Sequence, residues 1–315
     1  MRVAVTGASG LLGKALASLH VARGDAVRGL VRDAARAANG LPGVELIEGD
    51  LAADSARLAA LIDGADVVYH CAAELNDPAR MVATNVEGTR RLLAAAAGRV
   101  GRWVQASTVG VYGRPRDGTV TEASPLAPKD VYAETKARAD ALVAELASEG
   151  GFEHVILRAC AVIGPGMQGR FLHRLIGLLD RGLFAPVGAP GALVSLIPVA
   201  NATHALHECA RLPQAAGRIY NLADQCTVEH LAAVCCEALG RPAPRWRLPE
   251  APLRALVWLA ERTTVGQLTQ DKIDILTSRV RYATERIRAE LGYGEIVNLD
   301  DALRELVAAW REGAA

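Results

Sequence analysis

The sequence lacks several features that would assign it to particular protein classes. No run of about 18 apolar residues is present, which excludes a membrane-spanning helix. Net charge is absent too, with 35 Lys and Arg against 35 Asp and Glu, which argues against a protein that binds nucleic acid through a broad basic surface. The N-terminus, MRVAVTGASG, lacks the charged and apolar regions of a secretory signal. We therefore expect a globular cytoplasmic protein without a nucleic-acid partner.

Cysteine pairs of the CxxC type are also missing. The 6 cysteines are spread along the chain, so we interpret them as free thiols of a reducing compartment and expect no metal site. For the neighbours Cys235 and Cys236, burial in a helix is favoured over a redox-active pair. The apolar stretch Ala251–Ala260 could contact a membrane or cover an apolar pocket, although ordinary helix packing is favoured.

Short β-rich runs alternate with helical stretches in the first half of the chain. This alternation predicts an α/β fold of the Rossmann type, with a doubly wound parallel sheet of about seven strands. After about Gly164 loops rich in Gly and Pro appear, followed by helices with fewer strands, and from Thr227 on the chain is mostly helical. We predict a first domain over residues 1–164 with a returning piece near 192–224, and a smaller, mainly helical second domain over 165–191 and 225–315. The predicted strands are Arg2–Thr6, Ala26–Val31, Val44–Glu48, Val67–His70, Trp103–Ser107, His154–Arg158 and Ile219–Leu222, and the main helices of the first half are Leu12–Arg23, Leu58–Asp63, Asn85–Ala97 and Tyr132–Ser148.

A glycine-rich turn follows the first predicted strand. Gly7, Gly10 and Gly13 have the spacing GxxGxxG between a strand and a helix. The first glycine permits a tight turn, the second lets the backbone approach a pyrophosphate, and the third lets the helix pack close to the strand. The N-terminus of the helix offers N–H groups to the anion. We therefore predict that the first domain binds a dinucleotide through Gly7, Ser9, Gly10, Leu11, Leu12 and Gly13.

The residues after the second strand bear on the choice between NAD and NADP. Arg32 comes first and Asp33 next. An arginine here pairs with a 2′-phosphate, whereas an acidic residue binds the ribose hydroxyls. We favour NADP(H) over NAD(H), with Arg32 on the phosphate; the alternative is a solvated Arg32 with Asp33 turned toward the ribose. Further predicted cofactor residues are Asp50 and Leu51 after the third strand, and Ala72 and Ala73 after the fourth.

A tyrosine and a lysine four residues apart open a predicted helix. Tyr132 and Lys136 share one helix face, so the ammonium is expected to lower the pKa of the phenol. A phenol tuned in this way can exchange a proton with a carbonyl or an alcohol. Ser107 and Thr108 end the fifth strand, at the edge of the sheet where ligands bind in this class of fold. One of these hydroxyls can bind the reacting oxygen.

Together these segments resemble the extended short-chain dehydrogenase/reductase superfamily, also called the NAD-dependent epimerase/dehydratase family. The matching motifs include TGASGLLG, GDL, HCAA, NVEGTRRLL, ASTVGVYG, YAETK and LRACAVIGPG. The resemblance implies a Rossmann domain with seven strands and a small C-terminal substrate domain. It implies Tyr132 as acid/base, Lys136 on the ribose and the tyrosine, and Thr108, with Ser107 beside it, as the hydroxyl on the substrate. Asn85 matches the helix asparagine that supports the site.

Departures from the family pattern narrow the choice of substrate. Val109 and Gly110 stand where sugar-nucleotide 4,6-dehydratases carry an Asp-Glu pair. Ala161 stands where galactose-type epimerases keep an asparagine, and Gly188–Pro198 contains no basic residue for a diphosphate. Asn201 replaces the usual aspartate of a following element. These departures, with the apolar character of the segment Gly191–Val199, favour an apolar substrate.

Two further similarities favour the branch of 3β-hydroxysteroid dehydrogenases and dihydroflavonol 4-reductases. Leu268–Tyr293 is similar to the C-terminal pattern of the steroid group, and VRGLVRD is similar to the NADP-binding strand of the flavonol-type reductases. We therefore predict an NAD(P)-dependent oxidoreductase that interconverts a carbonyl and an alcohol on an apolar small molecule by hydride transfer. The alternatives are a nucleotide-sugar epimerase or reductase of the same superfamily, and an NADP(H)-binding redox sensor without catalysis.

The family resemblance also bears on assembly. Members pair two long helices of each subunit into a four-helix bundle, which here would be Asn85–Ala97 and Tyr132–Ser148. Ala and Leu on the outer faces of these helices are compatible with a homodimer and equally with packing on the sheet.

Overall fold

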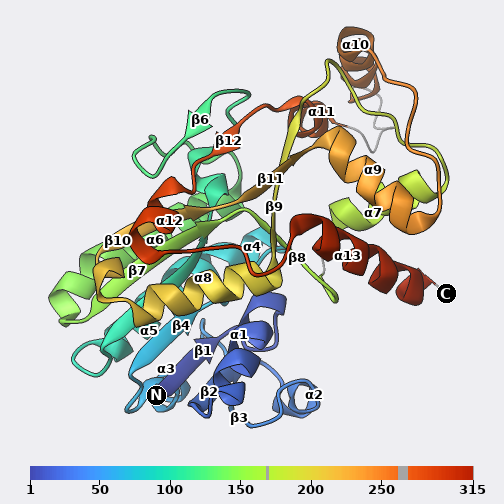
Figure 1. Cartoon of the computed structure of the whole chain (residues 1–315). Helices are drawn as coiled ribbons and strands as arrows, with labels where there is room; N and C mark the ends of the chain where they lie inside the picture. The colour runs from blue at the N-terminus through green and yellow to red at the C-terminus, as the bar shows by residue number, and fades with distance from the viewer. Residues whose placement is uncertain (168–169, 262–268, 315) are drawn as a thin grey trace.

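The computed structural model describes residues 1–167, 170–261 and 269–314. At its centre lies a seven-stranded sheet in the order β10-β7-β5-β4-β1-β2-β3, whose strand pairs are all parallel (Figure 1). The prediction of a doubly wound parallel sheet is confirmed. The strands are β1 (Arg2–Thr6), β2 (Ala26–Val31), β3 (Val44–Glu48), β4 (Val67–His70), β5 (Arg102–Thr108), β7 (Glu153–Ala159) and β10 (Arg218–Leu222).

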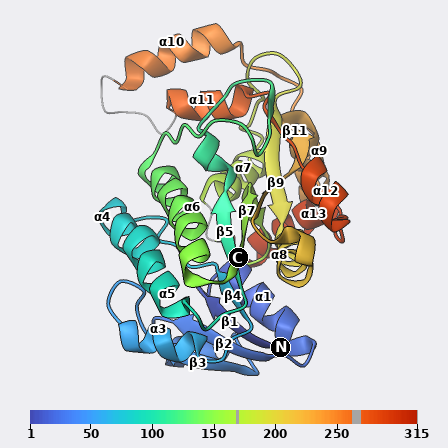
Figure 2. The same cartoon turned by 90° about the vertical axis from the view of Figure 1, so that its left-hand side faces the viewer.

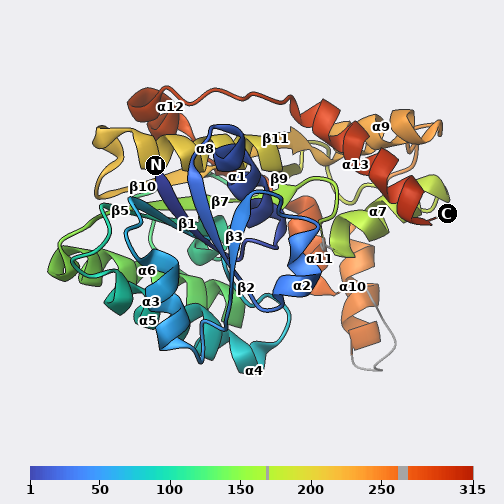
Figure 3. The same cartoon turned by 90° about the horizontal axis from the view of Figure 1, so that it is seen from below.

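Helices cover both faces of this sheet because its strands are apolar on both sides. In β5, Trp103 faces the core beneath one set of helices and Val104 faces the core beneath the other. Figures 2 and 3 show α3, α5 and α6 on one side of the sheet and α1 and α8 on the other. Whether α5 and α6 also pair with a second subunit stays a prediction. These helices are α1 (Leu11–Ala22), α3 (Ser55–Ile62), α5 (Gly88–Ala96), α6 (Val131–Gly150) and α8 (Val199–Arg211).

The order of the strands creates a crevice at one edge of the sheet. The chain order reverses between β1 and β4, and ligands of doubly wound folds bind at the carboxyl ends of the strands at such a point. The glycine turn follows β1, Ala72 and Ala73 follow β4, and Thr108 ends β5. Three predicted parts of the site therefore meet at one edge.

The helix predicted over Asn85–Ala97 begins earlier and is less regular. It consists of α4 (Pro78–Met81), a π-helical segment η1 (Val82–Glu87) and α5. Asn85 lies within the π-helical segment. Such segments are rare and are often found at functional sites. The apolar periodicity of the sequence does not distinguish them from an α-helix.

The second half of the chain contains a three-stranded sheet that the sequence analysis missed. Its order is β11-β9-β8, with β9 antiparallel to β11 and parallel to β8. These strands are short and pair across long sequence separations, so local periodicity does not reveal them. Helices α7, α9 and α13 share a separate apolar core with this sheet, while the domain limits given above stay a prediction. The elements are β8 (Ala161–Ile163), β9 (Leu193–Pro198), β11 (Asp224–Thr227), α7 (Arg170–Asp180), α9 (Val228–Leu239) and α13 (Leu299–Ala314).

Helices α10 (Glu250–Glu261) and α11 (Gln270–Thr277) stand at the top of the molecule in Figure 1. In the apolar stretch that forms α10, Val257 is buried in a small cluster with Leu253, whereas Leu256 is exposed. One face of α10 therefore packs against the protein, as in an ordinary amphipathic helix. Leu268, which begins the segment similar to the steroid group, lies outside the described residues. The remaining elements are α2 (Ala34–Ala38), β6 (Thr119–Val120), η2 (Val109–Tyr112), η3 (Pro213–Ala215), β12 (Arg281–Tyr282) and α12 (Glu285–Leu291).

The predictions about membrane spans and thiols can be compared with the described part of the chain. None of its helices is long and apolar enough to cross a membrane. All six cysteines are free, and Cys235 and Cys236 are buried in α9. Burial raises the pKa of Cys235 to about 12, so its thiol is protonated at neutral pH. This placement agrees with the core interpretation of the pair.

Buried histidines predict a loss of stability in acid. Burial lowers the pKa of His70 to about 3, and it also lowers those of His20 and His207. The unfolded chain binds protons at these side chains near the ordinary value of 6.5, while the folded chain keeps them neutral. Stability is therefore complete above about pH 6.5 and declines as the pH falls, by about 1.4 kcal/mol per pH unit for His70.

Thermal unfolding measured at a series of pH values tests this expectation. The melting temperature should fall from about pH 6.5 to about pH 4, and less steeply in His70→Gln, which retains a polar side chain but does not titrate. A flat pH dependence in the unmodified protein would contradict the assignment of neutral, buried imidazoles.

Candidate active site

The turn after β1 has the geometry that its glycines predict. Gly7 has a φ of 65°, and a Cβ there would lie 2.8 Å from the backbone of Ala72. A Cβ on Gly13 would lie 2.2 Å from the carbonyl oxygen of Gly7, and one on Gly10 would lie 3.2 Å from the same oxygen. The Gly10 N–H donates to that oxygen at 2.9 Å and closes the turn. Close backbone approaches therefore require small residues here, most strictly at position 13.

The start of α1 completes an anion-binding corner. The helix begins at Leu11, and its N-cap, Gly10, offers no side chain to bind the N–H groups of the first turn. Leu12 packs against the main core, and Ser9 is exposed beside a neighbouring cavity. The uncapped N–H groups and the positive end of the helix dipole suit a pyrophosphate.

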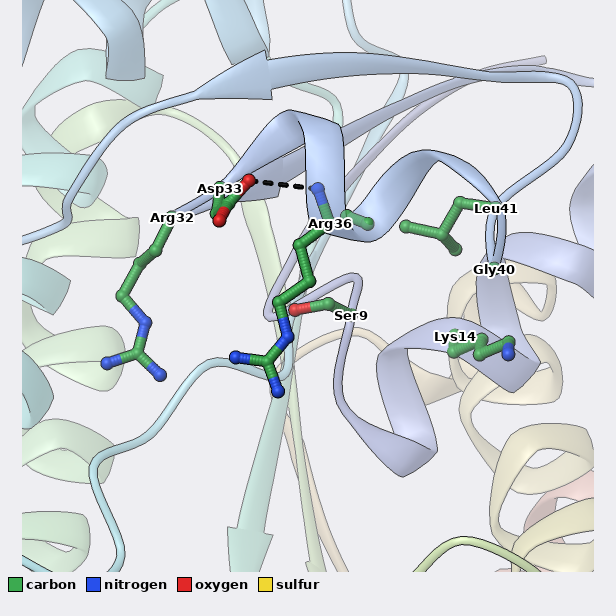
Figure 4. A pocket seen from close by; sticks show the side chains of 8 residues that line it. Ser9, Lys14, Arg32, Asp33, Arg36, Gly40 and Leu41 are labelled. Carbon is green, nitrogen blue, oxygen red and sulfur yellow. Dashed lines mark hydrogen bonds between the residues drawn. The ribbon is translucent and has the colours of Figure 1, made fainter.

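A cavity of about 330 Å³ beside this turn is lined by the basic side chains of Lys14, Arg32 and Arg36. In Figure 4 the guanidinium groups of Arg32 and Arg36 extend in the same direction, with Ser9 next to Arg36. The carboxylate of Asp33 accepts a hydrogen bond from the Arg36 N–H at 2.9 Å and thereby caps α2. Three cations and one carboxylate thus line the cavity, a balance that suits a phosphate group.

Two of these cations were missed by the sequence analysis. Lys14 directly follows Gly13, and Arg36 lies four residues after Arg32. The four-residue spacing from Arg32 to Arg36 places the two side chains together only once α2 is known, and α2 has just five residues. Arg32, the predicted phosphate residue, is the member of the set that the sequence identified.

Asp50 and Leu51 have local roles at the end of β3. One carboxylate oxygen of Asp50 accepts from the Ala52 N–H at 2.8 Å, and the other lies 3.5 Å from Arg80. The side chain of Leu51 is buried beneath Gly88 of α5, where an added Cβ would lie 2.9 Å from the Leu51 Cβ. The side chain of Leu51 therefore belongs to the core, and the contact of Asp50 and Leu51 with a cofactor stays a prediction.

A buried chain of hydrogen bonds ties the end of β4 to the glycine turn. The Thr6 hydroxyl lies 2.7 Å from His70 Nδ1 and accepts from the Ala72 N–H at 3.1 Å. His70 Nε2 lies 2.9 Å from the hydroxyl of Thr89, which donates its own proton to a backbone carbonyl. The neutral imidazole is therefore protonated on Nε2 and accepts at Nδ1. This chain holds Ala72 and the adjoining Ala73, both half-buried, beside the turn.

Asn85 joins this region to α6. Its Oδ1 accepts from the Glu74 N–H at 2.7 Å, and its Nδ2 donates to the Glu74 carbonyl and to the Thr135 hydroxyl, both at 3.1 Å. Thr135 directly precedes Lys136. Asn85 therefore connects the loop after β4 with the helix that carries the predicted acid/base, a placement that suits a supporting residue.

The two hydroxyls at the end of β5 have different surroundings. Thr108 is half-buried, and its Oγ1 accepts from the Gly110 N–H at 3.1 Å. A Cβ on Gly110 would lie 3.3 Å from that oxygen and 3.7 Å from the Cβ of Ala133, so the Thr108 hydroxyl lies close to the first turn of α6. Ser107 is buried and donates to Asp140 at 2.9 Å. Its hydroxyl is engaged in the interior, which leaves Thr108 as the better placed of the two.

Tyr132 and Lys136 lie at the start of α6, whose N-terminus is capped by Asp130. Lys136 is buried, and its Nζ donates to the Ala106 carbonyl at 2.6 Å. Burial raises the pKa of Tyr132 to about 12, and the carboxylates of Asp140 and Asp130 act in the same direction. The expected lowering of this pKa by Lys136 is therefore wrong for the structure, because burial dominates and the ammonium points to the end of β5.

The segment Gly188–Pro198 receives cations from elsewhere in the chain. Arg279 donates to the Pro190 carbonyl at 2.6 Å, and Arg247 donates to the Gly188 carbonyl at 3.0 Å. The absence of basic residues in the segment itself therefore does not mean that its surroundings lack positive charge. Arg279 is exposed and was not identified from the sequence.

With this geometry established, comparisons with known proteins decide the family. The model of the NAD dependent epimerase/dehydratase family matches residues 3–223, which include the glycine turn, Thr108, Tyr132 and Lys136. The chain belongs to this family. It is accordingly an enzyme of the extended short-chain dehydrogenase/reductase class, whose members use a nicotinamide dinucleotide for oxidoreduction, epimerisation or dehydration.

Individual relatives span these chemistries. Over 327 residues the chain is 33% identical to the 4-hydroxy-2-methyl-3-oxo-4-farnesyl-3,4-dihydroquinoline-1-oxide ketoreductase of Stigmatella aurantiaca, covering 97% of this chain and 96% of that one. It is 26% identical to the UDP-glucose 4-epimerase of Vibrio cholerae over 328 residues, covering 98% and 95%. A short-chain dehydrogenase/reductase superfamily protein from Agrobacterium tumefaciens with bound NAD is similar with a TM-score of 0.77 and 26% identity, over 100% of this chain and 98% of that chain.

Proposed function

We propose that the protein is an NADP(H)-dependent oxidoreductase that interconverts a carbonyl and an alcohol on an apolar small molecule. The observation that carries this proposal is the position of the first turn of α6, which holds Tyr132, beside Thr108, with Lys136 bonded to the Ala106 carbonyl near the end of β5. The glycine turn lies at the same edge of the sheet. A proton donor, a cation and a hydroxyl at the dinucleotide site are the groups that carbonyl reduction requires.

The residues present fit a bound dinucleotide. The space at Gly7, Gly10 and Gly13, which a Cβ would fill, suits the pyrophosphate against the N-terminus of α1. Arg32 and Arg36, which line the same cavity as Lys14, suit a 2′-phosphate. The engagement of Asp33 as the N-cap of α2 supports NADP(H) over NAD(H), because one of its carboxylate oxygens is bonded to the helix backbone.

The roles of the other residues follow from their places. When bound, the nicotinamide supplies or accepts the hydride. We assign to Tyr132 the proton transfer at the substrate oxygen and to Thr108 a hydrogen bond that holds this oxygen. Lys136 contributes a buried positive charge at the end of β5 that favours negative charge on the substrate oxygen. Asn85 keeps the start of α6 in place through Thr135.

Two observations support an apolar substrate and the steroid or flavonol type of reductase. Val109 and Gly110 provide none of the acid/base groups of an elimination, which disfavours a dehydratase. The Stigmatella relative is named as a ketoreductase of a farnesylated quinoline oxide. By analogy we assign a ketone of an apolar molecule as the substrate.

A parallel titration of the purified protein with NADPH and NADH tests the cofactor assignment. NADPH should bind more than tenfold more tightly, a difference of about 1.4 kcal/mol. Substituting Arg32 or Arg36 with Ala should weaken NADPH binding about 10- to 100-fold and leave NADH binding nearly unchanged, because a charge-assisted hydrogen bond contributes about 1.5–3 kcal/mol.

Arg181→Ala serves as the matched control, since this exposed arginine follows α7, away from the cavity. Its dissociation constants for both cofactors should equal those of the unmodified protein. A tenfold preference for NADH would reverse the assignment of Arg32 and Arg36.

A nucleotide-sugar epimerase is the second candidate, and Arg279 is the observation that favours it. This exposed arginine beside Pro190 could bind a diphosphate, and one full-length relative is named as a UDP-glucose 4-epimerase. Binding measurements with UDP- and GDP-sugars separate the candidates. Tight binding that is lost in Arg279→Ala would favour the epimerase.

A further inference from the structure

A buried carboxylate lies on α6 one turn beyond Lys136. Asp140 is four residues after Lys136 and eight after Tyr132, so the three residues share one face of the helix. Its Oδ2 accepts from Ser107 Oγ at 2.9 Å and from Arg158 Nε at 3.0 Å. Asp140 and Arg158 are both almost fully buried. Neither has a role in the proposed chemistry so far.

The two partners of this carboxylate come from two strands of the central sheet, and the network around them reaches a third. Arg158, in β7, also donates to the Tyr112 hydroxyl at 2.9 Å, and its guanidinium lies 5.1 Å from the centre of that ring. The Tyr112 hydroxyl donates to Asn221 of β10 at 2.8 Å. Ser107 belongs to β5. Asp140 is therefore the point at which α6 is joined to a buried polar network beneath the site.

Lys136 and Asp140 attach α6 to consecutive residues of β5. Lys136 donates to the carbonyl of Ala106, and Asp140 accepts from the side chain of Ser107. The next residue of the strand is Thr108. The two bonds therefore fix the register between the helix that carries Tyr132 and the strand that presents the Thr108 hydroxyl.

Three titratable side chains, Asp140, Cys71 and His70, act electrostatically on or with the Lys136 ammonium. Burial lowers the pKa of Lys136, whereas Asp140 on the same helix and Cys71 after β4 oppose this effect. Burial raises the pKa of Cys71 to about 12, so this thiol is uncharged at neutral pH. His70 also faces Lys136 and is neutral, as its hydrogen bonds require. Among the described residues, Asp140 therefore supplies the carboxylate that acts on the buried ammonium.

One oxygen of the carboxylate is left without a partner. Asp140 Oδ1 is buried and has no hydrogen bond within the described structure. A buried polar atom without a partner costs free energy and calls for an explanation other than stability. The explanation that we favour is that the carboxylate places a negative charge near Lys136.

We propose that Asp140 is a positioning residue of this site, which holds α6 in register with β5 and keeps the buried Lys136 ammonium charged. The catalytic part of this inference rests on the proposed function. The contacts of Asp140 are independent of that function. Arg158 and Ser107 hold the carboxylate in place, and Arg158 balances its charge. The loss of this charge should therefore lower the pKa of Lys136, and it should also change proton transfer at Tyr132, whose pKa Asp140 raises.

The titration of Lys136 measures this effect directly. The chain has only four lysines, Lys14, Lys129, Lys136 and Lys272, so ¹³C-lysine NMR of the complete protein can follow each side chain separately. Asp140→Asn is expected to lower the pKa of Lys136 by about one pH unit or more, because a neutral amide cannot stabilise the ammonium. The other three lysines should titrate as before and report an intact fold.

Tyr112→Phe is the matched control. It removes a hydrogen bond to Arg158 from the same network without changing any charge near Lys136. The Lys136 pKa should stay within about 0.3 pH units of its value in the unmodified protein. Equal shifts in Tyr112→Phe and Asp140→Asn would show that loosening of the network, rather than the charge of Asp140, moves the lysine, and an unchanged Lys136 in Asp140→Asn would overturn the proposal.

Removing Asp140 alone leaves the guanidinium of Arg158 uncompensated, which can prevent folding. The double variant Asp140→Asn/Arg158→Gln removes both charges and should show the same fall of the Lys136 pKa, because Arg158 is not among the groups that act on that lysine. A Lys136 pKa equal to that of the unmodified protein would again overturn the proposal. If the pKa falls but no carbonyl substrate is turned over by the unmodified protein, the proposed function fails and the role of Asp140 stands.

Discussion

Tyr132→Phe should lower kcat for NADPH-dependent carbonyl reduction about 10³-fold, within the range that general acid/base catalysis contributes. The variant removes the hydroxyl proton and leaves a ring of nearly the same shape at the start of α6. Burial raises the pKa of this phenol, so near neutral pH the hydroxyl holds its proton and suits reduction, in which it donates. Steady-state kinetics with NADPH in excess measure the loss, and a binding titration should give a dissociation constant for NADPH within about twofold of that of the unmodified protein.

The matched control is Tyr293→Phe. The Tyr293 hydroxyl is buried and has no hydrogen-bond partner among the described residues, so its removal costs no hydrogen bond. This variant should keep full turnover. If Tyr132→Phe turned over as fast as the control, Tyr132 would not be the proton donor and the enzymatic interpretation of α6 would fail.

Gly13→Ala should abolish measurable cofactor binding and lower the melting temperature by several degrees. The added Cβ would lie 2.2 Å from the carbonyl oxygen of Gly7 and 2.8 Å from its carbon, both backbone atoms that cannot rotate away. Relief of this overlap must move α1 away from the turn, which costs about 1–3 kcal/mol as overpacking and opens the pyrophosphate corner. Calorimetric titration with NADPH and thermal unfolding measure the two effects.

Gly294→Ala is the control for this prediction, because no atom lies within 4 Å of the Cβ that it adds. Binding of NADPH and the melting temperature should be close to those of the unmodified protein. NADPH binding by Gly13→Ala within tenfold of the unmodified protein would contradict the role given to the glycine turn.

The parts of the fold that the sequence predicted well have strong local signals. The bounds of β1, β2, β3 and β4 agree with the predicted runs, because each is a short apolar segment between turn residues. The glycine turn was also predictable, since the spacing of its glycines reflects backbone approaches within a few residues of one another and across to Ala72. The resemblance to a known family then supplied the roles that we propose for Thr108 and Tyr132.

What the sequence did not predict depends on contacts between distant segments. The sheet of β8, β9 and β11 pairs residues 28 to 35 positions apart, and Arg279 reaches Pro190 across 89 positions. Arg36 lines the basic cavity because the short helix α2 lets its side chain extend in the same direction as that of Arg32. The raised pKa of Tyr132 follows from burial, which the four-residue spacing to Lys136 does not report.

The measurement that tests the central claim most directly follows the absorbance of NADPH while the protein is offered apolar ketones and, separately, UDP- and GDP-sugars. We predict net oxidation of NADPH with at least one apolar ketone, dependent on Tyr132, and no tight binding of any nucleotide sugar. Interconversion of a nucleotide sugar without net change in NADPH, or cofactor binding without turnover of any carbonyl compound, would contradict the proposed function.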